Sequence, residues 1–205
     1  MVPEAPPAPR LAAVRARHAA SLIVLGPGPT MLMGLRGARH RFMPNRLVFP
    51  GGSVDRGDAV APASSELRPH VQALLGKSAK PGLARAIAMA AARELEEETG
   101  LALGAPPALA ALDYLGRLVT PPESPIRFNA RFFVAPAEAV GGALAGSGEL
   151  EDLRWFGLEE ALALDLARPT RAVVGLLQAW LALSPAERAA RTEAPVMRRR
   201  QLVAE

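Results

Sequence analysis

Arg93-Glu94-Leu95-Glu96-Glu97-Glu98-Thr99-Gly100-Leu101 is the stretch from which the organisation of this chain follows. It continues an alanine-rich apolar run over 83–92 that contains no glycine or proline, and this composition predicts a helix. Gly100 follows the last acidic turn, where a left-handed residue commonly stops a helix at little cost to glycine. The stretch therefore predicts a long helix that ends in a cluster of carboxylates.

On a helix of roughly 100° per residue, the apolar face around Ile87 continues into three carboxylates, Glu94, Glu97 and Glu98. Like charges near a helix C-terminus are unfavourable in isolation. One interpretation is a solvated face with an ion pair between Arg93 and Glu97. The other is an inward carboxylate cluster that a hard cation, Mg²⁺ or Mn²⁺, compensates.

Length and composition predict a globular protein of one or two domains and limit the kinds of ligand that it can bind. The 205 residues suit one domain with additions or at most two small ones, and half of them are hydrophobic, which is enough for a full core. The net charge of +4 suits a polyanionic ligand such as a nucleotide. Absent cysteine excludes disulfides and thiolate metal sites. The sequence shows neither a membrane-spanning apolar run nor a signal-peptide pattern, so we expect a cytoplasmic protein with no membrane partner.

Upstream of the helix, a basic loop and a glycine pair are candidate ligand-binding features. The loop over 36–46 holds five potential cations, including Arg36 and Arg41, and either faces phosphate or is simply solvated. The short strand Leu47–Phe49 runs into Gly51 and Gly52, and paired glycines let the backbone approach a ligand closely.

The pattern of elements predicts an α/β sandwich. A hairpin over 21–36, a strand before the glycine pair, the acidic helix, further strands over 112–120, 127–135 and 153–156, and a helix over 170–183 suit a mixed sheet between helices. We expect an N-terminal arm over 1–20, helical or loose from 11, a domain over 21–183 and a basic tail over 184–205. An insertion over 59–85, with a short helix over 69–75, separates the glycine pair from the acidic helix.

These motifs resemble the Nudix box, Gly-x5-Glu-x7-Arg-Glu-U-x-Glu-Glu-x-Gly-U, in which U is apolar. The stretch 93–101 is similar to its second half, and Gly52 to Asp58 is similar to its first half, with Asp58 in place of Glu. The resemblance implies a Nudix-type α/β/α sandwich whose box is split by the insertion. We expect the insertion to bulge near the substrate, as a lid, as a contact in a homodimer or without a function.

The resemblance also implies the roles of the site residues. Glu94, Glu97 and Glu98 would bind Mg²⁺ or Mn²⁺, Arg93 would orient them, and the glycine pair would bring the backbone next to the phosphate. Family members hydrolyse a phosphoanhydride bond of a nucleoside diphosphate linked to another group. Such a reaction depends mainly on positioning and charge neutralisation.

The general base is left open by the sequence. Glu149 resembles the acidic residue that often precedes a short strand containing Trp, here Trp155, and is a candidate catalytic residue. A solvated acidic loop is the competing interpretation, and Glu151 and Asp152 are competing candidates.

The substrate is suggested by a second resemblance. Arg36, Arg41, Phe49, Pro50 and the glycine pair at 51–52 are similar to an extra motif of coenzyme A-directed Nudix hydrolases, whereas Gly34, Gly37, Asn45 and Leu47 depart from it. Arg36, Arg41, Phe49, Gly51 and Gly52 are therefore candidate substrate-binding residues, with coenzyme A or a derivative as substrate.

Two alternatives to an enzyme follow from the same residues. A non-catalytic Nudix-like regulatory module would bind nucleotides, but it would not need the complete set of clustered acids. A nucleic-acid binder would use the basic loop and the Arg198–Arg200 tail. It ranks last because aromatics are only 4% of the chain and offer bases little to stack on.

Overall fold

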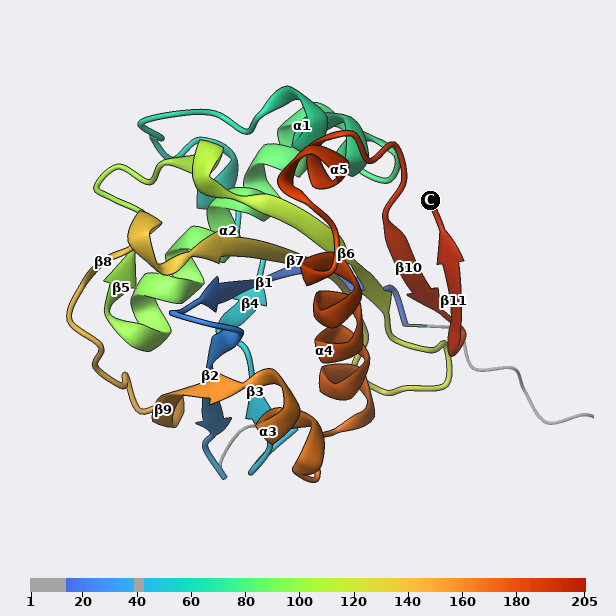
Figure 1. Ribbon diagram of the computed structural model, residues 1–205. Helices are drawn as coiled ribbons and strands as arrows, with labels where there is room; N and C mark the ends of the chain where they lie inside the picture. Colours follow the sequence, from blue (N-terminus) through green and yellow to red (C-terminus); the bar gives the residue numbers. More distant parts are fainter. Residues whose placement is uncertain (1–13, 39–42) are drawn as a thin grey trace, which may run out of the picture.

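A mixed sheet with helices on both faces forms the body of the protein (Figure 1). The computed structural model describes residues 14–38 and 43–205. The strands of the main sheet are β1 Arg17–Leu25, β2 Thr30–Arg36, β3 Leu47–Val48, β4 Gly51–Ser53, β6 Asp113–Val119, β7 Phe128–Pro136, β9 Leu150–Gly157, β10 Pro195–Arg198 and β11 Gln201–Ala204. A separate pair consists of β5 Leu101–Ala102 and β8 Gly141–Gly142. The helices are α1 Pro69–Gly76, α2 Pro81–Thr99, α3 Leu158–Ala163, α4 Arg168–Leu181 and α5 Pro185–Ala189, with short 3-10 turns at Gly57–Ala59, Leu109–Ala111 and Ala137–Ala139.

Strand β1 is central to the sheet, whose order is β11-β10-β6-β7-β1-β2-β3. It pairs in parallel with β7 along its whole length, and its other edge meets β4 and then β2. Leu22 and Val24 face one core while Ile23 faces the other. This burial on both faces explains the uninterrupted apolar run in the sequence.

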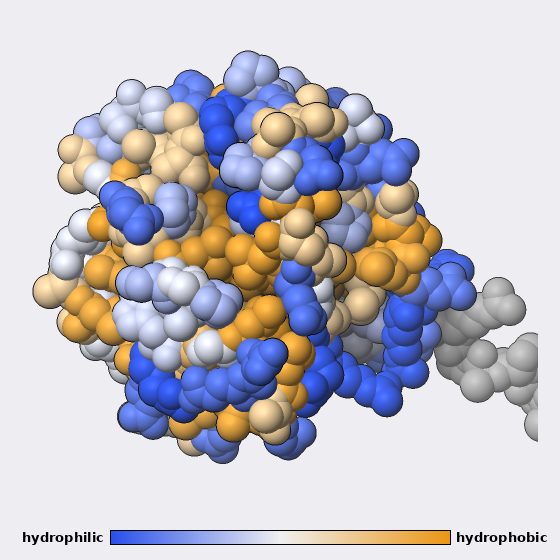
Figure 2. Space-filling view, viewed as in Figure 1, coloured by the Kyte–Doolittle hydropathy of each residue, from blue (hydrophilic) through white to orange (hydrophobic). Residues whose placement is uncertain are grey.

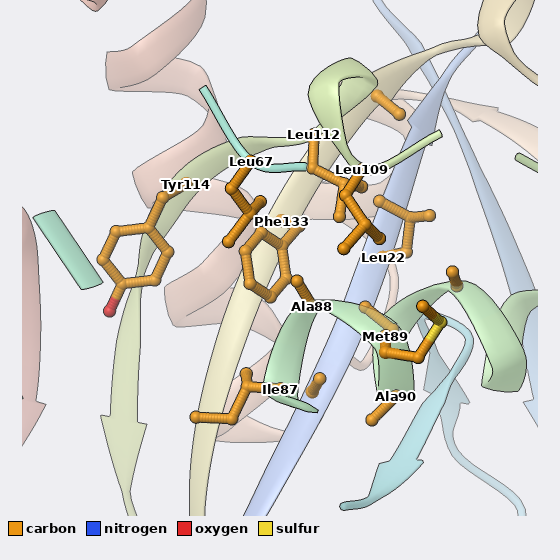
Figure 3. Packing of buried hydrophobic residues seen from close by; sticks show 14 of the residues in the cluster. Leu22, Leu67, Ile87, Ala88, Met89, Ala90, Leu109, Leu112, Tyr114 and Phe133 are labelled. Carbon is orange, nitrogen blue, oxygen red and sulfur yellow. The ribbon is translucent and has the colours of Figure 1, made fainter. Parts of the chain in front are cut away.

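Helix α2 has the extent that the sequence predicts. Pro81 starts it at a position that needs no amide donor. Gly100, with φ of 72°, ends it and donates its N–H to the carbonyl of Glu96. The helix packs its alanines and Ile87 against the sheet, together with Phe133 and Tyr114 (Figure 3). The small alanine side chains bring α2 close to β1 and β4.

The insertion over 59–85 is part of the core. Its buried hydrophobic side chains are Leu67, Val71, Leu74, Leu75, Ala79 and Ala84. Helix α1 packs against α2 and β6. The expectation that this segment bulges out beside the substrate is therefore wrong for α1, because its apolar face supplies one wall of the α2-side core.

Both ends of the described chain extend the sheet beyond the expected boundaries. The arm expected over 1–20 is wrong at 17–20, which lie in β1. Residues 1–13 lie outside the described part. The tail expected over 184–205 contains α5 and the hairpin β10–β11, and β10 pairs in parallel with β6. On the opposite face from α2, α3 and α4 cover a second core (Figure 1). No helix in the described ranges is long and apolar enough to cross a membrane.

Candidate active site

The C-terminal turn of α2 lies against the glycine pair of β4. Gly51 donates its backbone N–H to Glu98 Oε2 at 2.7 Å. An added Cβ at Gly51 would collide with the Ser21 hydroxyl and the Ala20 carbonyl, and its φ of 155° also favours glycine. Glu98 is 2% exposed, so the carboxylate expected to point inward does so.

Gly52 provides the space for a second carboxylate. A Cβ at Gly52 would overlap the Glu94 carboxylate group. The Glu94 side chain is 13% exposed, and burial raises its pKa, while neighbouring Arg93 acts in the opposite direction. The absence of a side chain at residue 52 is thus what allows helix and strand to meet around this group.

Arg93 joins the two halves of the site. Its Nε and Nη2 donate to the two oxygens of the Asp58 carboxylate at 2.9 and 3.2 Å, and Nη2 also donates to the Ser53 carbonyl. Its Nη1 donates to Glu94 Oε1 and to Glu97 Oε2, each at 2.9 Å. The hydrogen bond to Asp58 raises the pKa of Arg93, which therefore stays charged. Asp58, 2% exposed, is a candidate site residue that is absent from the predicted set, although its spacing from Gly52 matches the first half of the motif.

Glu97 does not share the burial of its neighbours. Its side chain is 58% exposed, and its ion pair with Arg93 has the i,i+4 spacing of the solvated interpretation. The inward expectation is therefore wrong for Glu97, because this residue lies on the outer side of the last turn. It still lies within reach of the cluster through Arg93.

Arg36 and Glu149 complete the charged surroundings. Arg36 Nη2 lies 3.9 Å from Glu98 Oε1 and 3.4 Å from the Gly51 carbonyl oxygen. Glu149 is exposed on the loop before β9, and its charge raises the pKa of both Glu94 and Glu98. Burial is the main cause that raises the pKa of Glu98, to about 7.

The donor set of this site fits a divalent cation. Five carboxylates, those of Asp58, Glu94, Glu97, Glu98 and Glu149, accompany two guanidinium groups, those of Arg36 and Arg93. Carboxylate oxygens are the ligands that Mg²⁺ and Mn²⁺ prefer, and the excess of negative charge calls for a cation. Within the described residues, no three acidic, histidine or cysteine side chains are already gathered as a metal site. One nitrogen of Arg93, Nη1, binds one oxygen of Glu94 and one of Glu97, so the two carboxylates lie on the same guanidinium group.

One further candidate is buried in the core, and another lies outside the described residues. Phe49 is 4% exposed and packs in the core on the α4 side. Its ring is enclosed by the protein itself, and a part for Phe49 in substrate binding stays a prediction. Arg41 lies outside the described residues.

Comparisons with known proteins agree with this geometry. Residues 81–176 match the family model described as NUDIX domain. A NUDIX hydrolase from Alicyclobacillus acidocaldarius is 27% identical, with a TM-score of 0.63 over 82% of this chain and 93% of that chain. A MutT NUDIX hydrolase from Burkholderia pseudomallei is 20% identical, with a TM-score of 0.53 over 80% of this chain and 98% of that chain. The NUDIX domain of Shewanella oneidensis NrtR, complexed with ADP ribose, is 14% identical, with a TM-score of 0.51 over 82% and 90% of the two chains.

The last two likenesses concern the fold alone. A search among curated proteins found no match. The domain match and the Alicyclobacillus structure support the Nudix domain family for this chain. Both comparisons are likenesses to Nudix domains and Nudix hydrolases over the matched part of the chain.

Proposed function

We propose that the protein is a Mg²⁺- or Mn²⁺-dependent hydrolase that cleaves the phosphoanhydride bond of a nucleoside diphosphate linked to another group. The observation that carries this proposal is the contact between the buried Glu98 carboxylate and the Gly51 N–H, beside Glu94 and the Arg93–Asp58 pair. This arrangement places several carboxylates beside two glycines that have no side chains. The carboxylates suit a cation, and the exposed backbone of the glycines lets a phosphate approach closely.

The residues have distinct roles in the proposed reaction. Glu94, Glu97 and Glu98 would hold the cation, which would supply charge neutralisation for the diphosphate and activation of the attacking water. Arg93 keeps Glu94 and Glu97 in place and is itself fixed by Asp58. Arg36, which lies between Glu98 and the glycine pair, binds a phosphate oxygen.

The proposed general base is Glu149. The water oxygen forms a bond to phosphorus, its proton passes to the Glu149 carboxylate, and the bond between phosphorus and the bridging oxygen breaks. Glu149 suits this role because it is exposed and placed on a loop beside β2, where its carbonyl accepts the N–H of Gly37. A base must come within hydrogen-bond reach of the water, and loop placement allows this when substrate binds.

Coenzyme A or a derivative is the substrate we propose within this class. The support is the position of Arg36 at the site and the spacing of the motif that runs from it to the glycine pair. The proposal of a split box has independent support, because Asp58 and Arg93 form one ion pair across the insertion.

The test is hydrolysis of coenzyme A, ADP-ribose, NADH and dinucleoside polyphosphates with Mg²⁺ or Mn²⁺, with products identified by mass. We expect cleavage of coenzyme A into phosphopantetheine and adenosine bisphosphate, and a loss of at least about 10²-fold in Glu98→Gln. Glu96→Gln is the matched control, since Glu96 is exposed on the same helix turn. Wild-type turnover by Glu98→Gln would contradict the proposal, and tight nucleotide binding without turnover of any substrate would favour the regulatory module.

A further inference from the structure

A second cationic hollow lies at the end of the sheet where β6 and β7 meet the β10–β11 turn. It has a volume of about 280 Å³. The polar residues that line it are Arg117, Thr120, Arg127, Asn129, Arg198 and Arg199. None of them belongs to the candidate active site. Hydrophilic side chains gather on the side of the molecule where the β10–β11 turn lies (Figure 2).

The wall of this hollow contains a buried guanidinium group. The Arg117 side chain is 5% exposed, and it donates through Nη2 to the Glu205 carboxylate and through Nη1 to Asn129 Oδ1. Its Nε is buried without a hydrogen-bond partner among the described residues. Burying a guanidinium is costly unless anions and acceptors satisfy it. Arg117 is therefore only partly compensated by the protein itself.

A second buried arginine lies directly across the strand pair. Arg131 is paired with Arg117 in the β6–β7 register and is fully buried. Its hydrogen-bond partners among the described residues are neutral groups: the His18 ring, the Asn129 carbonyl, and the carbonyl and hydroxyl of Ser78. Burial lowers the pKa of Arg131 to about 10, and the charge of Arg117 acts in the same direction. The two strands thus concentrate positive charge behind the hollow.

The cations at its opening are also poorly neutralised. Arg127 donates to the carbonyls of Thr120 and Val14 and contacts no carboxylate in the described structure. Arg198 lies 3.6 Å from the same Glu205 carboxylate that binds Arg117. Arg199 is exposed and forms no ion pair with any described residue. Among the described residues, one carboxylate thus pairs with two of the four lining arginines, and the other two have none.

The turn that carries Arg199 is in an unusual conformation. Arg199 and Arg200 have φ values of 50° and 64°, and the paired residues Arg198 and Gln201 flank them. A two-residue hairpin turn with two positive φ angles normally uses Asn-Gly. Each non-glycine residue in this conformation is strained, because its Cβ approaches the following carbonyl oxygen. Backbone strain of this kind accompanies functional positions, and here it places an arginine at the hollow.

We propose that this hollow, which we call the arginine site, binds a phosphate or diphosphate group at a place separate from the active site. Guanidinium groups bind phosphate oxygens through paired, charge-assisted hydrogen bonds. A nucleic-acid backbone is usually contacted by exposed cations spread along a surface. A concave site with a buried guanidinium in its wall favours a small phosphorylated anion instead.

The test is calorimetric titration of the full chain with inorganic pyrophosphate in the presence of a chelator, which removes metal-assisted binding at the active site. We expect saturable binding to the wild type and about tenfold weaker binding to Arg199→Gly, the loss of one charge-assisted hydrogen bond. Arg200→Gly is the matched control, because it removes an equal charge and an equal positive-φ residue from the same turn but does not line the hollow. We expect it to bind like the wild type.

Three results would overturn the arginine site. Equal weakening in Arg199→Gly and Arg200→Gly would mean general charge attraction. Weakening in Arg36→Ala with normal binding by Arg199→Gly would place pyrophosphate at the active site. If the protein bound a single-stranded oligonucleotide but neither pyrophosphate nor ADP, the ligand of this hollow would be a nucleic acid and not a small anion. Parallel titrations with phosphate, pyrophosphate and ADP distinguish a bare anion from a nucleotide. Hydrolysis by Arg199→Gly at saturating substrate is expected to match the wild type.

Discussion

Asp58 and Arg93 form a two-bond ion pair across 35 residues of sequence. The pair closes the gap that the insertion opens, because it ties the segment after the glycine pair to the acidic end of α2. Arg93 in turn holds Glu94 and Glu97. The geometry of the carboxylates therefore depends on a residue that has no direct role in the proposed chemistry.

Replacing Asp58 tests this dependence. Asp58→Ala leaves Arg93 without its buried partner, and we expect a loss of roughly 2 kcal/mol in the free energy of unfolding. This is less than the ~3–5 kcal/mol of a fully buried pair, because Arg93 is partly exposed. We also expect a lower kcat. Urea unfolding and initial rates measure both effects. Asp55→Ala is the control, since the Asp55 side chain forms no ion pair with any described residue. Equal effects in the two variants would contradict the role of Asp58.

A methyl group at residue 52 tests the close approach of β4 to the helix. Gly52→Ala forces the Glu94 carboxylate away, and a displacement of about 1 Å at a catalytic group can cost 10²-fold in rate. We expect such a loss in kcat with the fold retained by circular dichroism. Gly57→Ala is the matched control, because nothing lies within 4 Å of its added Cβ. Full activity in Gly52→Ala would show that Glu94 is not needed where it lies.

The raised pKa of Glu98 predicts a dependence of stability on pH in chelator. The pKa is about 7 in the folded protein and 4.5 ordinarily, so the folded state keeps a proton that the unfolded chain releases first. Stability is therefore lost as pH rises from 4.5 to 7, by on the order of 3 kcal/mol at most. Glu98→Gln should lose less unfolding free energy over this pH range than the wild type. The difference in unfolding midpoint between the variant and the wild type should therefore be larger at pH 8 than at pH 5. Glu96→Gln should show no such difference, and parallel behaviour of wild type and Glu98→Gln would disprove the assignment.

The insertion is expected to behave as core. Leu75 is fully buried against the α2-side cluster, so Leu75→Ala should cost about 2–5 kcal/mol in unfolding free energy. The exposed neighbour Gln72→Ala should change it by no more than ~0.5 kcal/mol. Chemical denaturation measures both. A Leu75→Ala variant as stable as Gln72→Ala would show that α1 is a detachable appendage.

The helix and its stop were predictable because they depend on local sequence. The alanine run, the acids and Gly100 give α2 its extent, and the spacing from Gly52 pointed to Asp58. The exposure of Glu97 was not predictable in this way, because it is decided by which side of the last turn meets β4. The burial of Phe49 depends on α4, which comes more than a hundred residues later.

The end of the chain shows a second limit of sequence reasoning. Arg198, Arg199 and Arg200 are typical of a solvated tail, yet they form the end and the turn of a hairpin. Strand β10 is held by parallel pairing of Val196 with Arg117, a contact between distant segments. No local pattern indicates such a pairing, and the arginine site depends on it.

The bond from Gly51 to Glu98 has a practical consequence for engineering. Its donor is an amide of the main chain, which nineteen of the twenty amino acids possess; proline alone lacks it. Randomising side chains on the neighbouring loops to change substrate preference would leave that anchor in place. The position of the Glu98 carboxylate would therefore be kept when side chains on those loops are changed, because its hydrogen-bond donor belongs to the backbone.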